Sequence, residues 1–185
     1  MAKIVIDESD LAKRGPLIRK LLAPILDQRN RGALAFTTGP KSSDQYFVAA
    51  FDKRTASELE NLRFATFHKE FRANYYEVWI PFDRVGHKKW CLSKAYLHIY
   101  RVNRSTAEET EFVALHADPQ EPDGDLAAYK RTPHIHIKAS EYPIPKAHIA
   151  ITIGSLRQVL DSSQTLFAAM KHGIELIKDE ILIRF

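Results

Sequence analysis

The stretch RTPHIHIKASEYPIPKAHIAITIG, residues 131–154, decides the predicted fold, because polar and β-branched residues alternate in two short runs within it. The runs are 134–137 (HIHI) and 148–153 (HIAITI). Successive side chains of a strand point to opposite faces of a sheet, so the isoleucines of each run share one face and the histidines lie on the other. We predict two strands, each buried on its isoleucine side and joined by the proline-containing segment 139–147.

Pairing of these two strands would bring three imidazoles together on the face opposite the isoleucines, those of His134, His136 and His148. Two histidines at i and i+2 on a strand point the same way, which suits metal ligation, and a third from a neighbouring strand completes the set. Glu141, in the connection, offers a carboxylate. The sequence therefore predicts a site for a divalent metal such as zinc, with these three histidines and Glu141 as ligands.

A metal-free site is the alternative chemistry. Histidine titrates near neutral pH, so the same imidazoles could act as general acids or bases. Lys138 lies at the end of the first run and could stabilise an anionic, phosphate-containing or other small-molecule ligand. The candidate catalytic residues are therefore His134, His136, His148 and Lys138. The opposing interpretation is that the histidines occupy an outward or subunit-facing strand surface and carry no chemistry.

Short motifs around the histidines match known families only in part. His134, His136 and Glu141 resemble the first half of a cupin metal motif, but the glycine and the second motif of that pattern are missing. The run 134–137 resembles part of the histidine triad of nucleotide-binding phosphoryl-transfer enzymes, with Lys138 where the last histidine belongs. Neither resemblance assigns the chain to a family.

Outward from this stretch, the chain alternates between segments typical of strands and of helices. Aromatic and β-branched residues predict strands at 33–38, 45–51, 75–82, 89–102 and 111–116. The polar connections between the later strands are short, which favours antiparallel neighbours. Apolar residues at helical spacing predict helices at 11–29, 55–72, 155–160 and 163–180.

Two of these predictions leave alternatives open. Pro24 must kink the first helix or end it early, and 62–67 would also suit a strand. The ending 181–185 (ILIRF) is too apolar to be left in solvent, so we expect Leu182, Ile183 and Phe185 to cover a sheet edge or meet another subunit. The predicted fold is a single α+β domain, residues 1–185, in which N-terminal, middle and C-terminal helices pack on a largely antiparallel sheet.

Composition excludes several classes of protein. A chain of 185 residues with 45% hydrophobic and 27% charged residues fits one folded domain, and no apolar run is long enough for a membrane span. Cys91 is the only cysteine, so no internal disulfide can form; we expect a buried, inert thiol and a cytoplasmic protein. The net charge of +4 comes from scattered basic residues, which predicts at most weak nucleic-acid binding.

The sequence thus supports two classes of function. The first is a small hydrolase or nuclease that uses the predicted histidine site. The second is a noncatalytic binding or assembly protein whose histidines lie on a strand surface or at a subunit interface. The apolar C-terminus and the need to cover sheet edges favour a homodimer in either case.

Overall fold

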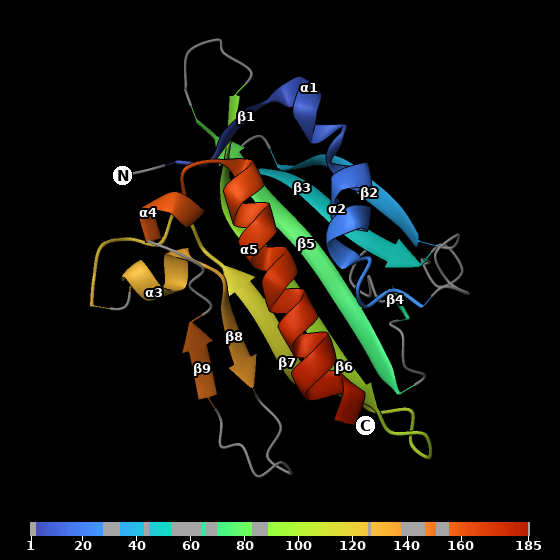
Figure 1. Cartoon of the computed structure of the whole chain (residues 1–185). Helices are drawn as coiled ribbons and strands as arrows, with labels where there is room; N and C mark the ends of the chain where they lie inside the picture. The colour runs from blue at the N-terminus through green and yellow to red at the C-terminus, as the bar shows by residue number, and fades with distance from the viewer. Residues whose placement is uncertain are drawn as a thin grey trace.

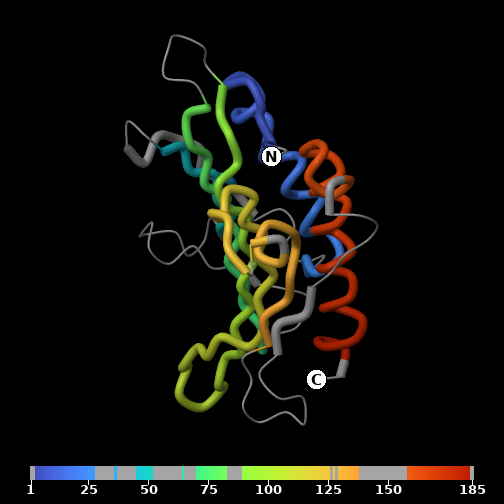
Figure 2. Tube along the Cα trace, turned by 90° about the vertical axis from the view of Figure 1, so that its left-hand side faces the viewer, coloured from blue at the N-terminus to red at the C-terminus, as the bar shows by residue number. Residues whose placement is uncertain are grey.

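The computed structural model describes residues 3–27, 34–42, 45–52, 64–65, 70–82, 89–125, 127–137, 147–150 and 156–184. They form a predominantly antiparallel β-sheet, and helices α2 and α5 lie on the same side of it (Figures 1 and 2). The helices are α1 (Glu8–Leu11), α2 (Arg14–Leu22), α3 (Ala127–Arg131), α4 (Leu156–Val159) and α5 (Ser163–Leu176). Of the described helices, none combines the length and the apolar character that crossing a membrane requires.

The described strands form one sheet in which every pair is antiparallel. They are β1 (Val5–Asp7), β2 (Leu34–Ser42), β3 (Gln45–Asp52), β4 (Phe64–Ala65), β5 (Phe71–Pro81), β6 (Lys89–Val102), β7 (Glu109–Ala117), β8 (His134–Ile137) and β9 (Ala147–Ala150). The order across the sheet is β2-β3-β5-β6-β7-β8-β9, with β1 paired to β6 and β4 to β5. The strands predicted at 45–51, 89–102, 111–116 and 134–137 are confirmed.

The hydrophobic core lies between the sheet and the helices. Strand β5 shows the period of two clearly, since alternate residues from Phe71 to Trp79 are fully buried and those between them are half-buried. Ile135 and Ile137 of β8 belong to the same core as Ile18 of α2 and Met170 of α5. Ile135 and Ile137 therefore lie on the buried side of β8, as predicted, and the side chains of the other isoleucines of the stretch 131–154 lie outside the described residues.

Helix α5 begins with a capping serine, Ser162. The Ser162 hydroxyl accepts a hydrogen bond from the Thr165 backbone N–H, and the Thr165 hydroxyl accepts one from the Ser162 N–H. This reciprocal arrangement satisfies two donors that a helix N-terminus would otherwise leave without partners. Leu166, Met170 and Ile174 then recur every four residues on the buried side. The C-terminal docking helix is confirmed.

The predicted middle helix, 55–72, is wrong where the structure describes it. Phe64–Ala65 form β4, and Phe71 and Arg72 begin β5. Phe71, which fits helical spacing, is buried in β5 instead, and Phe64–Ala65 agree with the alternative that 62–67 would suit a strand. Burial of side chains in the tertiary structure overrides weak local periodicity, as it often does in segments whose apolar residues fit both helix and strand spacing.

The predictions for the two ends of the chain are confirmed in part. The helix predicted at 11–29 is divided into α1, which ends at Leu11, and α2, which ends at Leu22, so the alternative that Pro24 ends the helix early is confirmed. At the other end, helical turns continue beyond α5 as a π-helical turn, Ile177–Ile181, and a 3-10 turn, Leu182–Arg184, so this segment forms no strand. Leu182 is fully buried in the helical layer, whereas Ile183 is 65% exposed. Phe185 lies outside the described residues.

Candidate functional site

The sheet face opposite α2 and α5, which we call the histidine face, carries imidazoles from three adjacent strands. Residues opposite one another in antiparallel strands share a face, so the register defines two cross-strand rows. The first row runs through Tyr76, Tyr96, His116 and His134. The second runs through Asn74, His98, Ala114 and His136.

Three of these histidines form a group suited to metal ligation. His116 of β7 and His134 and His136 of β8 each offer one ring nitrogen, and the three nitrogens lie within 4.8 Å of one another. Ligands on a tetrahedral zinc, each about 2 Å from the ion, would lie about 3.4 Å apart. Ring rotation that shortens the longest separation by about 1.4 Å would therefore allow all three to bind one ion. The residue types and their approach fit zinc.

His134 is held in one orientation by the backbone. Its side chain is buried, and its Nδ1 lies 2.8 Å from the carbonyl oxygen of Thr132. A carbonyl oxygen only accepts hydrogen bonds, so Nδ1 must carry the proton and donate it. In the neutral ring this leaves the lone pair on Nε2, which is the arrangement that metal-binding histidines usually have.

His116 lies at the centre of the group and is kept neutral. Burial lowers the pKa of His116 to about 2, and the neighbouring His98, His136 and His134 add to the effect. The Tyr96 ring stacks on the His116 ring with centroids 3.9 Å apart. The His116 Nε2 atom is buried and has no hydrogen-bond partner among the described residues, which is costly unless a ligand or water satisfies it.

Carboxylates flank the histidine group. His98 Nδ1 lies 2.5 Å from Glu111 Oε1, with both side chains less than one fifth exposed. The Tyr96 hydroxyl donates a hydrogen bond to the Asp118 carboxylate. Burial raises the pKa of Asp118, and burial together with this hydrogen bond raises the pKa of Tyr96. Imidazoles, a phenol and acidic groups therefore meet on one partly buried surface.

The predicted site residues fall into two groups. The structure brings His134 and His136 together, and the β8–β9 register places His148 directly opposite His136. The side chain of His148 and the whole of Lys138 and Glu141 lie outside the described residues. From the sequence, His116 shares a strand face with Ala114 and Phe112 that could add to the site, but it was not among the predicted ligands. Only the β7–β8 pairing shows that it lies beside His134.

Cys91 is buried, as expected. Burial raises the pKa of its thiol, so the reactive thiolate is disfavoured at neutral pH. The cysteine therefore adds nothing to the site.

A buried ionic network in the core was not predicted. Arg14 of α2 makes two hydrogen bonds to the Glu77 carboxylate, from Nε at 3.0 Å and from Nη2 at 2.7 Å. Tyr75 and Trp79 donate further hydrogen bonds to the same carboxylate, each at 2.9 Å. The guanidinium also lies over the rings of Trp79 and Phe167. Four donated hydrogen bonds satisfy Glu77, so this network fits a structural role.

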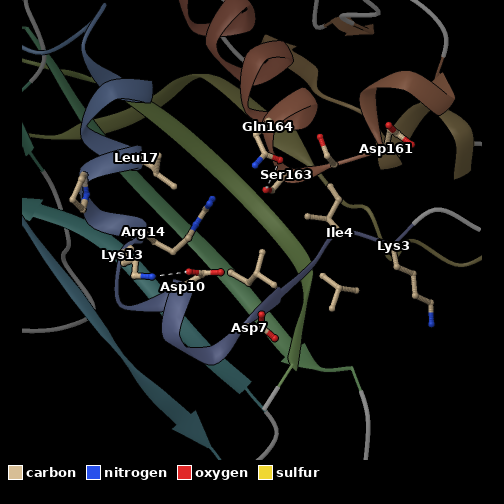
Figure 3. A pocket seen from close by; sticks show the side chains of 14 residues that line it. Lys3, Ile4, Asp7, Asp10, Lys13, Arg14, Leu17, Asp161, Ser163 and Gln164 are labelled. Atoms are coloured by element: carbon tan, nitrogen blue, oxygen red, sulfur yellow. Dashed lines mark hydrogen bonds and ion pairs between the residues drawn. The ribbon is translucent and has the colours of Figure 1, made fainter. Parts of the chain in front are cut away.

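A pocket of about 700 Å³ adjoins Arg14, between β1, α1, α2 and the start of α5 (Figure 3). Its rim carries charges of both signs, with Lys3 and Lys13 near Asp7, Asp10 and Asp161. Lys13 pairs with Asp10 at 3.0 Å, and the charge of Arg14 is balanced by Glu77. Because the rim carries charges of both signs, it does not indicate a class of ligand, whereas the histidine face does.

No protein-family model, curated protein or solved structure matches this chain significantly. The functional argument therefore rests on the chemistry of the histidine face.

Proposed function

We propose that His116, His134 and His136 hold a divalent transition metal, and that the chain uses it as a small metal-dependent hydrolase. The observation that carries this proposal is the approach of three ring nitrogens from two adjacent strands to within 4.8 Å. The Thr132 carbonyl supports it by fixing the tautomer of His134. The depressed pKa of His116 also supports it, because a metal ligand must be unprotonated.

The chemistry follows from the number of ligands. Zinc bound by three protein ligands keeps a fourth position for water, and such a metal lowers the pKa of that water to about 7. Substrates of this class are esters, phosphoesters and, in the nuclease version, nucleic acid. His148 stays proposed as an alternative to one of the three ligands, because its backbone is paired with that of His136. Glu141 likewise stays proposed as an alternative ligand, and Lys138 as an anion-binding group, so that one position is left for water.

The experiment is metal titration of chelator-treated protein. We expect one equivalent of Zn²⁺ or Co²⁺ to bind with micromolar or tighter affinity in calorimetry. We also expect 4-nitrophenyl acetate or bis(4-nitrophenyl) phosphate hydrolysis to disappear with EDTA and return with metal. A protein that binds neither ion would refute the metal site; one that binds metal without hydrolysing either substrate would contradict the assignment as a hydrolase of these two substrate classes.

A noncatalytic binding or assembly role is the second candidate, and the ring contacts favour it. Tyr96 and His116 stack at 3.9 Å, and Tyr76 lies parallel to His98 with centroids 6.1 Å apart. Such contacts would stabilise an aromatic surface without any reaction. Metal-independent folding together with absence of hydrolysis would favour this role.

The remaining parts of the proposal concern the whole protein. We take residues 1–185 as one α+β domain and the chain as a cytoplasmic homodimer that binds nucleic acid weakly.

Ile183 is the largest exposed apolar group of the C-terminal turns, at 65% exposure. We expect light scattering to give a dimer mass and Ile183→Asp to give a monomer mass. A monomeric parent protein would refute the dimer, and an unchanged dimer of the variant would remove Ile183 from its interface.

A further inference from the structure

The His98–Glu111 pair lies beside the three proposed ligands and is not explained by them. His98 is on β6, directly across from Ala114, which in turn lies across from His136. A register shift between Ile99 and Tyr100 places Glu111 opposite Tyr100, where its carboxylate reaches His98. Ala114 is fully buried. It therefore lies at a position that solvent does not reach, between the strand positions of His98 and His136.

The hydrogen bond to Glu111 defines how His98 faces the site. A carboxylate accepts hydrogen bonds, so Nδ1 of His98 donates, and the neutral ring then presents a lone pair at Nε2. The two nitrogens are separated by one ring carbon, and their N–H and lone-pair directions diverge widely. Glu111 lies opposite Tyr100 and His116 opposite Tyr96, so the two flank the position of His98, and the His98 and His116 ring centroids are 4.8 Å apart. With Nδ1 hydrogen-bonded to Glu111, Nε2 is the nitrogen available on the side of His116.

His98 is not a member of the proposed ligand set. The described group of mutually close ring nitrogens contains His116, His134 and His136 but not His98, although the His98 and His116 ring centroids are 4.8 Å apart. A ligand nitrogen must approach a zinc ion to about 2 Å, whereas a group that contacts metal-bound water needs only hydrogen-bond distance to that water. The position of His98 fits the second role.

We propose that His98, oriented by Glu111, accepts a hydrogen bond from the water or hydroxyl group that occupies the fourth position of the metal site. His98 is thus a positioning residue, and this inference rests on the proposed metal site. Such a bond fixes the direction in which the water presents its remaining lone pair to a substrate. An anion that carries no proton cannot make this hydrogen bond. The bond therefore makes the water harder for such an anion to displace.

The test uses Co²⁺-loaded protein, with metal affinity and azide affinity as separate readouts. Azide displaces the water but cannot donate a hydrogen bond to His98. In His98→Phe, which keeps a ring without an acceptor nitrogen, we expect azide to bind about 3- to 10-fold more tightly, the usual effect of one hydrogen bond. Glu111→Gln should shift azide affinity in the same direction by less. Metal affinity should change by less than about 3-fold in both variants.

Tyr76→Phe is the matched control, because it keeps the ring that lies parallel to His98. It should leave azide and metal affinity unchanged. Unaltered azide binding in His98→Phe would overturn the proposal, as would loss of metal binding, which would make His98 a ligand. Failure of the parent protein to bind Co²⁺ would instead refute the metal site itself.

Discussion

Replacing Glu77 by leucine will lower the free energy of unfolding by about 3 to 5 kcal/mol, the typical cost of removing one partner of a buried ion pair. The guanidinium of Arg14 is 2% exposed and would keep its charge without a counter-ion. Tyr75 and Trp79 would also lose the acceptor of their hydrogen bonds. Urea denaturation of both proteins measures the difference.

Two further variants separate charge from packing. Glu77→Gln keeps the shape and one acceptor oxygen, so it should cost less than Glu77→Leu. The double variant Arg14→Met/Glu77→Leu should recover part of the lost stability, because no unpaired charge remains. It should not recover all of it, because the Tyr75 and Trp79 donors stay unsatisfied.

Glu175, whose side chain is 39% exposed, provides the control. A change of less than about 0.5 kcal/mol is expected for Glu175→Gln. Equal stability of Glu77→Leu and the parent protein would contradict a stabilising network.

Alanine at any one of the three proposed ligands will weaken Zn²⁺ or Co²⁺ binding by more than about 100-fold, because even the loss of an outer-shell partner costs 10- to 100-fold. The residues are His116, His134 and His136. His116→Ala should also abolish any metal-dependent hydrolysis, since two ligands hold the ion too weakly for turnover. Calorimetry on chelator-treated variants measures the affinity.

His172→Ala is the control for this series, because His172 lies on α5, on the other side of the sheet, with its side chain 59% exposed. Its metal affinity should equal that of the parent protein. His148→Ala and Glu141→Ala extend the series to the predicted residues whose side chains the structure does not describe. A large loss in either would add that residue to the coordination sphere. Full retention of binding in His116→Ala would contradict the central position given to this histidine.

The sequence determined the parts of the fold that depend on local pattern. Period-two alternation was sufficient for β6 and β8, because Ala95, Leu97 and Ile99 of β6 and Ile135 and Ile137 of β8 enter one core. The spacing of Phe167, Met170 and Ile174 by three and four residues likewise placed α5. The prediction of a helix around Phe64 and Phe71 was wrong, because the apolar spacing of this segment fits a helix and a strand alike. Only packing decides between them.

Tertiary structure alone decided which side chains meet. The i, i+2 spacing of His134 and His136 is a local property, so the sequence placed both on one face. His116 is distant in the chain, and its approach depends on the β7–β8 register, which no local pattern specifies. Arg14 and Glu77 are 63 positions apart, so their contact exists only because α2 packs on the sheet. Local periodicity fixes the direction of each side chain along its own strand or helix, whereas strand register and helix docking decide the neighbours it finds there.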